Sequence, residues 1–242
     1  MSRLGGVILL AGVLAFPGLG ALAQTSAQTE VPEPAGAGEP AAAPEPIDLG
    51  DGRYRIGNIV VDRNTSPFSV AGSVLPVDTE AMPIEFLAVT RGGMKAYEAI
   101  IELDTDAVSF NLACILLGLD ASKATLPVYH FDPAVLKGDP VQIDVSWVRD
   151  GTIQTHGLID LILVDGKPAP ADWVYLGSGF GQNGLYMAEA YGTLIGVVHD
   201  PDSIIQHRTG LGLGDYGAVT VNPELMPAAG TPVTITVSAP RS

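Results

Sequence analysis

Apolar and polar residues alternate along Val141-Gln142-Ile143-Asp144-Val145-Ser146-Trp147. A period of two places the apolar side chains on one face of a β-strand and the polar ones on the other, so we expect one buried and one wet face. The next residues, Val148-Arg149-Asp150-Gly151-Thr152-Ile153, set Asp-Gly between two apolar runs. Glycine accepts the positive φ of a tight turn, so this stretch predicts a β-hairpin.

Short β-branched segments bounded by turn residues recur on both sides of this hairpin and predict further strands. With the hairpin's first strand, they are 55–62, 83–90, 141–148, 158–164, 173–176, 193–198 and 233–237. These strands do not alternate with long helices, which argues against a doubly wound parallel sheet. A shorter helical turn is expected at 201–205.

One amphipathic helix is expected over 106–117, with Asp104 or Thr105 as its cap and Gly118 at its end. Apolar residues recur there at helical spacing. They are Val108, Leu112, Ile115, Leu116 and Leu119. The predicted fold is therefore a β-rich α+β domain, built on a mainly antiparallel sheet with that helix packed on it.

The amino-acid composition divides the chain into three segments. Residues 1–23 read as a signal peptide, with Arg3 before an apolar stretch and Ala21-Leu22-Ala23 as the cleavage site. An uncleaved membrane anchor is the alternative, because the apolar run is close to spanning length. Residues 24–46 hold five prolines and four glutamates, which predicts a disordered linker, either a spacer or a tail without a role of its own. Residues 47–242 are expected to form a single domain.

Charge and cysteine content exclude several classes of function. The chain of 242 residues has 27 acidic and 12 basic residues, a net charge of −15, which argues against binding nucleic acid. A single cysteine cannot form an internal disulfide, a four-cysteine zinc site or an iron–sulfur cluster. Two runs, 177–184 and 210–217, contain the dinucleotide pattern G-x-G-x-x-G. The segment after the first is too short for the required helix, and the residues after the second read as a strand, so no cofactor is predicted.

A metal site is one hypothesis. His199, Asp200, Asp202 and His207 lie close together in sequence and supply imidazole and carboxylate ligands suited to zinc or a related metal. The alternative is a hydrogen-bonded loop in which Asp200 or Asp202 caps a turn. His130 and His156 lie in other segments without ligand spacing.

A ligand-binding surface is a second hypothesis. Aromatic residues gather near the two glycine runs, where they could stack on sugar rings or hold an apolar partner segment. They are Trp173, Tyr175, Phe180, Tyr186, Tyr191 and Tyr216. The alternative is that they belong to the strand core or anchor loops.

Several stretches in a fixed order resemble the YdjY-type domain of exported bacterial proteins. They are Leu112-Ala113-Cys114-Ile115-Leu116-Leu117-Gly118, Gly138-Asp139-Pro140-Val141 leading to Val145-Ser146-Trp147, Trp173-Val174-Tyr175-Leu176-Gly177-Ser178, Gly192-Thr193-Leu194-Ile195, Asp200-Pro201 and Gly230-Thr231-Pro232-Val233. The resemblance covers roughly 83–237 and implies export and fold, because the family has no established activity. Some relatives carry iron–sulfur labels, which do not transfer here since Cys114 alone cannot hold a cluster.

We therefore expect an exported, periplasmic or extracellular, non-catalytic binding or structural module. Its acidic charge permits a cation, a neutral glycan or a basic protein as partner. The alternative is a metal-dependent hydrolase in which His199, Asp200, Asp202 and His207 hold an ion that activates water.

Overall fold

The computed structural model describes residues 44–65, 67–77, 83–182, 184–213 and 217–240. Its strands are β1 (Ile47–Gly50), β2 (Arg53–Ile56), β3 (Ile59–Asp62), β4 (Pro67–Val74), β5 (Phe86–Thr90), β6 (Ala99–Leu103), β7 (Asp139–Arg149), β8 (Thr152–Gly157), β9 (Ile162–Val164), β10 (Trp173–Tyr175), β11 (Thr193–Gly196), β12 (Ile205–His207), β13 (Val219–Val221) and β14 (Pro232–Ser238). Its helices are α1 (Ala107–Leu116), α2 (Met187–Tyr191) and the short 3-10 turns η1 (Ala96–Glu98) and η2 (Leu158–Leu161). The predicted signal peptide 1–23 and residues 24–43 of the predicted linker 24–46 lie outside the described residues.

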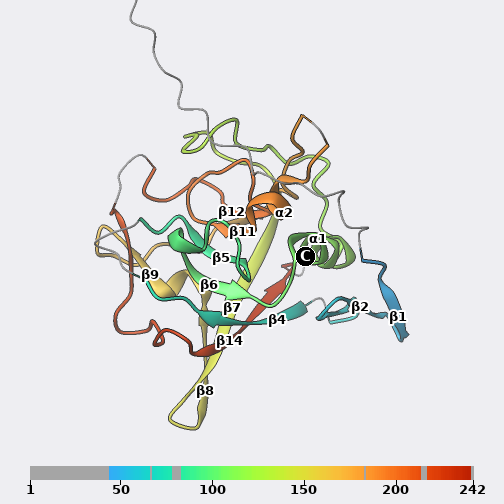
Figure 1. Cartoon of the computed structure of the whole chain (residues 1–242), viewed down its shortest axis with the longest axis horizontal. Helices are drawn as coiled ribbons and strands as arrows, with labels where there is room; N and C mark the ends of the chain where they lie inside the picture. Colours follow the sequence, from blue (N-terminus) through green and yellow to red (C-terminus); the bar gives the residue numbers. More distant parts are fainter. Residues whose placement is uncertain (1–43, 66, 78–82, 183, 214–216, 241–242) are drawn as a thin grey trace, which may run out of the picture. The chain divides into compact units, whose positions relative to one another are not determined.

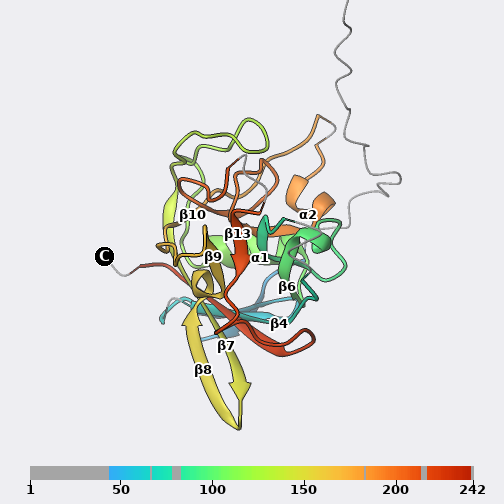
Figure 2. The same ribbon diagram turned by 90° about the vertical axis from the view of Figure 1, so that its left-hand side faces the viewer.

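The predicted hairpin is confirmed as β7 and β8. The two strands pair antiparallel from Asp144↔Gly157 to Arg149↔Thr152, and both turn residues have positive φ, 52° at Asp150 and 75° at Gly151. The turn end of this hairpin extends beyond the neighbouring strands (Figures 1 and 2). Along β7 the side chains of Ile143, Val145 and Trp147 are buried, as the period of two predicts.

Within the described residues, eight strands close into a barrel in the order β4-β14-β7-β10-β12-β11-β5-β6, because β6 pairs back to β4. The pairs β5–β6 and β11–β12 are parallel, and the others round the barrel are antiparallel. The expectation of a mainly antiparallel sheet with the helix packed on it is therefore wrong. A period of two indicates which face of a strand is buried, but carries no information on which strands pair or whether the sheet closes.

Gly72 lies where the barrel closes. It pairs with Val233 of β14 on one side and with Leu103 of β6 on the other. A Cβ at this position would lie 2.3 Å from the backbone oxygen of Glu102, so a side chain cannot fit without moving the β6 backbone. A glycine here therefore permits the close approach of β4 and β6.

Helix α1 matches the predicted 106–117 within a residue at each end, but its buried face differs from the prediction. Asp106 is the N-cap, not Asp104 or Thr105, and its Oδ1 accepts from the Ser109 N–H at 2.6 Å. The buried residues are Ala107, Ser109, Phe110, Ala113 and Cys114, whereas Ile115 is 48% exposed. The helix packs against β2, β3, β11 and α2. On its buried face the Phe110 ring meets Phe68 of β4 edge to face, with the ring centroids 5.4 Å apart. Figure 1 shows α1 beside β2.

Two smaller expectations are corrected. Residues 55–62 do not form one strand: β2 and β3 are a hairpin that turns at Gly57, whose φ is 53°. Residues 201–205 are not helical, and the second helix lies at α2 instead, ended by Gly192 at φ 76°. Among the described helices, none has both the length and the apolar character needed to cross a membrane.

Candidate functional site

His199, the first of the predicted metal ligands, is fully buried between two backbone carbonyls. Its Nδ1 lies 2.5 Å from the oxygen of Asp132, and its Nε2 lies 3.0 Å from the oxygen of His207. These contacts attach loop 117–138 to the end of β12. Both ring nitrogens therefore already have partners, and a metal ion would have to displace one of them.

His207 is also held by hydrogen bonds. Its Nε2 lies 3.1 Å from the oxygen of Pro170, its Nδ1 lies 3.3 Å from Oγ1 of Thr209, and its ring meets Trp173 edge to face. Burial is the main cause that lowers its pKa, which favours the neutral ring. Among the described residues, no three His, Cys, Asp or Glu side chains are grouped to hold a metal ion. The arrangement thus does not favour the metal-assisted hydrolase.

Asp200 and Asp202 occupy a tightly bonded turn between β11 and β12. The amide N–H of Asp202 donates to Oδ1 of Asp200 at 2.8 Å, as in the turn-capping alternative. Gln206 closes the turn from within the core: its Oε1 accepts from the Asp200 N–H at 3.0 Å, and its Nε2 donates to the Asp200 carbonyl at 2.5 Å. The turn is therefore fixed by a buried side chain, and the Asp202 carboxylate is only partly buried.

Six ionisable residues act on one another at the end of the barrel where β5 and β6 begin and β11 ends. This group, the charged cluster, consists of Glu85, Lys95, Glu98, His130, Asp200 and Asp202. Lys95 and Glu98 lie on the connection between the parallel strands β5 and β6, and the two aspartates lie on the connection between the parallel strands β11 and β12. The end of β11 lies beside the start of β5, where Gly196 pairs with Phe86, and β6 starts at the same end, where Ala99 pairs with Phe86. The last residues of the first connection and the first residues of the second therefore meet at this end of the barrel.

Backbone hydrogen bonds hold the segments of the charged cluster together. The amide of Glu85 donates to the carbonyl of Glu98, and the amide of Val197 donates to the carbonyl of Glu85, each at 2.9 Å. The loop that carries His130 is attached in the same way, since the amide of Phe131 donates to the carbonyl of His199 at 2.9 Å. Residues far apart in sequence are thus positioned by main-chain bonds, which do not depend on side-chain identity.

Two close ion pairs lie inside the charged cluster. Glu85 is 2% exposed, and its Oε2 lies 2.9 Å from Nε2 of His130, which is 37% exposed. Nζ of Lys95 lies 3.6 Å from the buried Oε2 of Glu98, an atom for which the described residues provide no hydrogen-bond donor. Lys95 and His130, the two cations of the cluster, are thus paired with Glu98 and Glu85, and they act on Asp200 and Asp202 only electrostatically.

Glu98, Asp200 and Asp202 of the charged cluster have raised pKa values. Burial raises the pKa of Glu98, and repulsion from Glu85 adds to it. Burial also raises the pKa of Asp200. The pKa of Asp202 is raised to about 7, first by burial and then by the negative charge of Asp200. The negative charge here is therefore incompletely compensated, and near neutral pH the two aspartates hold a proton that isolated side chains would have lost.

The pKa values of the two cations of the cluster are also raised, which for a basic group favours the charged form. The hydrogen bond with Glu85 raises the pKa of His130, although burial opposes it. Burial lowers the pKa of Lys95, but attraction to Glu98, and more weakly to Tyr97, Asp200 and Glu85, outweighs it and raises the pKa overall. The charged forms of both residues are thus favoured. A group of titrating residues with shifted pKa values is typical of functional sites.

Sequence reasoning found only Asp200 and Asp202 of this cluster. Glu85, Lys95 and Glu98 were missed, and His130 was set aside because it has no ligand spacing. The residues of the charged cluster are brought together by strand pairing and do not form a short sequence motif, so no local pattern points to them as a group. The glutamate at 85 gives one hint: it directly precedes an apolar run that becomes the buried strand β5.

The predicted aromatic surface is not brought together as one platform. Trp173 and Tyr175 are buried in β10, where the Tyr175 hydroxyl donates to Oδ1 of Asn111 at 2.8 Å. Tyr186 is half-buried and donates to the carbonyl of Gly177 at 3.0 Å. Phe180 is 72% exposed and contacts the Tyr186 ring. Tyr191 is partly buried in α2, and Tyr216 lies outside the described residues.

The sequence was compared with protein families, with curated proteins and with solved structures. The family model for the YdjY domain matches residues 59–238, which is most of the chain. No curated protein and no solved structure matches. The match spans β3 to β14 and includes every strand of the barrel and every member of the charged cluster. The chain belongs to the YdjY domain family.

Proposed function

We propose that this YdjY domain is an exported binding module whose charged cluster receives an organic cation, specifically a lysine side chain of a partner protein. One observation carries the proposal: the cluster holds four carboxylates, from Glu85, Glu98, Asp200 and Asp202, but only one lysine and one histidine, which pair closely with Glu98 and Glu85. Charge complementarity of this kind gives a binding site its specificity.

The raised pKa values of Asp200 and Asp202 make this binding depend on pH. An ammonium group placed beside Asp200 and Asp202 favours their charged forms and lowers both pKa values. Binding near neutral pH therefore releases protons. By linkage, affinity falls when the pH drops below about 7, the pKa of Asp202, because the carboxylates are then already neutral.

Exposed apolar side chains flank the charged cluster on two loops. Met94 and Tyr97 lie beside Lys95, and Val128 and Tyr129 precede His130. Burial and the nearby Glu98 charge raise the pKa of Tyr97, so its ring stays neutral next to the carboxylates. A lysine fits this combination, because its aliphatic stem packs on apolar surface while its ammonium pairs with carboxylates or an aromatic face.

The test is calorimetric titration of the full chain with a lysine-rich peptide and with the same peptide acetylated on its lysines. Above pH 7 we expect binding of the first peptide only, with proton release seen as a dependence of the heat on the buffer's ionisation enthalpy. Asp202→Asn and Glu98→Gln should each weaken binding, whereas Glu224→Gln, an exposed acid outside the cluster, should not. Equal binding of both peptides, or binding that the cluster variants leave unchanged, would overturn the proposal.

Metal content tests the alternative function. The hydrolase requires a bound ion at stoichiometric level, so elemental analysis of the purified chain decides between the two. We expect no stoichiometric transition metal. An ion that stabilises the chain and is lost on His199→Ala would make the hydrolase the better explanation.

We also propose that residues 1–23 direct export and are removed before Gln24. The positive residue Arg3, the apolar stretch and the small residues Ala21 and Ala23 support it. Expression of the full chain in a bacterial host, followed by fractionation and N-terminal sequencing, should yield a periplasmic or secreted protein that begins at Gln24. Retention in the membrane with an intact N-terminus would favour the anchor.

A further inference from the structure

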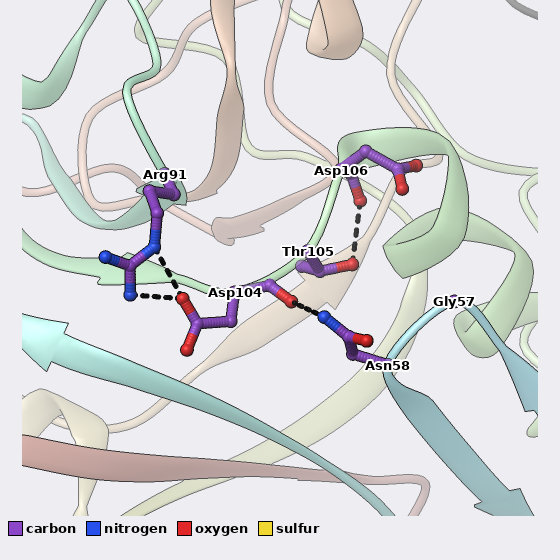
Figure 3. A pocket seen from close by; sticks show the side chains of 6 residues that line it. All are labelled: Gly57, Asn58, Arg91, Asp104, Thr105 and Asp106. Atoms are coloured by element: carbon purple, nitrogen blue, oxygen red, sulfur yellow. Dashed lines mark hydrogen bonds and ion pairs between the residues drawn. The ribbon is translucent and has the colours of Figure 1, made fainter.

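A pocket lies away from the charged cluster, beside the N-terminal end of α1. The Asn58 pocket, as we name it, has a volume of about 480 Å³ and is lined by Gly57, Asn58, Arg91, Asp104, Thr105 and Asp106 (Figure 3). These residues come from the β2–β3 turn, the segment after β5 and the β6–α1 connection. The volume falls within the range of pockets that bind small molecules.

The charges that line the Asn58 pocket are already paired. Nε of Arg91 donates to Oδ1 of Asp104 at 2.6 Å, Nη2 contacts the same oxygen, and Nη1 lies 3.3 Å from Glu102. The Asp106 carboxylate turns toward α1, where its two oxygens accept from the amide and the hydroxyl of Ser109 at 2.6 and 2.7 Å (Figure 3). An ionic ligand would have to break one of these pairs.

Polar groups with unused hydrogen-bonding capacity remain on the wall. A guanidinium has five N–H donors, and the contacts of Arg91 with Asp104 and Glu102 use one each on Nε, Nη1 and Nη2. Among the described residues, no hydrogen bond engages Oδ1 of Asn58 or Oδ2 of Asp104. Oγ1 of Thr105 donates to the Asp106 carbonyl and keeps its lone pairs. The wall thus offers donors and acceptors side by side.

We propose that the Asn58 pocket binds a neutral saccharide. Each sugar hydroxyl both donates and accepts, so adjacent hydroxyls can use the remaining Arg91 donors together with the Asp104 and Asn58 acceptors while leaving the ion pairs intact. An anion is disfavoured because Glu102, Asp104 and Asp106 outnumber Arg91.

The test is an amide NMR titration of the full chain with glucose, N-acetylglucosamine and maltotriose, and separately with acetate and methylammonium. We expect the neutral sugars to shift the amides of Gly57, Asn58 and Thr105, with little dependence on salt. Thr105→Val and Asn58→Ala should each weaken binding about three- to tenfold, the effect of losing one or two hydrogen bonds. Thr152→Val, an exposed threonine on β8, should leave the affinity unchanged.

The remaining outcomes are also decisive. The absence of shifts with all three sugars, or shifts confined to other segments, would overturn the proposal. Stronger shifts at these amides with acetate or methylammonium would show ionic recognition and overturn it as well. Asp202→Asn, which alters the charged cluster, should not change sugar binding, so failure of the lysine proposal and failure of this one are separate results.

Discussion

The buried carboxylate of Glu85 lies 2.9 Å from Nε2 of His130, and this contact joins the start of β5 to the loop 117–138. The pair lies in a part of the molecule where the carboxylates of Glu98, Asp200 and Asp202 have raised pKa values. Folding stability should therefore depend on pH in a direction that can be worked out from these groups.

We expect the chain to be more stable near pH 5.5 than near pH 8.5. The raised pKa of His130 gives stability that is present below its unfolded value and lost as the pH rises through the folded value. Glu98, Asp200 and Asp202 bind more protons when folded, so stability also falls as the pH rises from their usual values to their raised ones. Urea unfolding followed by tryptophan fluorescence at the two pH values measures the difference. A flat or rising profile would contradict the assignment.

Replacing Glu85 should change the titration of His130 directly. The Glu85 hydrogen bond is the largest cause of the raised pKa of His130. Glu85→Gln keeps the shape but removes the negative charge, so the His130 midpoint should drop. Proton NMR of the histidine ring measures it. The His130 midpoint should not change in Glu224→Gln. If Glu85→Gln also leaves it unchanged, Glu85 is not the cause of the raised pKa of His130.

Asp202→Asn should stabilise the protein above pH 7 and have little effect near pH 4. At high pH the substitution removes a charge that burial and Asp200 make unfavourable, since the pKa of Asp202 is about 7. The side chain is partly exposed and therefore screened by solvent, so we expect only about 1 kcal/mol, or roughly 2–4 °C in Tm. Thermal unfolding at both pH values measures it. Destabilisation at pH 8 would mean that this carboxylate makes a favourable contact instead.

Gly72→Ala should weaken the closure of the barrel. The new Cβ would lie 2.3 Å from the Glu102 oxygen and 2.7 Å from Cδ2 of Leu103, so β4 and β6 must separate. We expect a loss of about 3 kcal/mol or more in the free energy of unfolding. Gly179→Ala is the control, because its Cβ would meet atoms only at 3.5 Å and beyond. If Gly72→Ala and Gly179→Ala have similar free energies of unfolding, the close approach of β4 and β6 does not require a glycine at position 72.

Cys114 should be unreactive while the protein is folded. It is fully buried in α1, and burial raises the pKa of its thiol far above the usual value. A thiol-specific chromogenic reagent should react slowly with the native chain and at once after addition of denaturant. Fast reaction under native conditions would mean that α1 opens readily from β2 and β3.

The two errors about fold and site have a common cause. Local patterns predicted a mainly antiparallel sheet, and the lack of long helices between strands argued against a doubly wound parallel one, yet β5–β6 and β11–β12 are parallel and joined by the short connections 91–98 and 197–204. Those connections carry four of the six members of the charged cluster. A local sequence pattern does not predict which strands pair, and it therefore cannot predict the charged cluster, which depends on that pairing.

What the sequence determined alone is local. The alternation along 141–147, the Asp150-Gly151 turn and the helix at 107–116 follow from forces that act within a few residues, and all three are present. The order of strands, the closure at Gly72 and the meeting of Glu85 with His130 were decided by the tertiary structure. Pairing between distant strands depends on the whole set of competing registers, and a shifted pKa depends on burial, which exists only once the chain has folded.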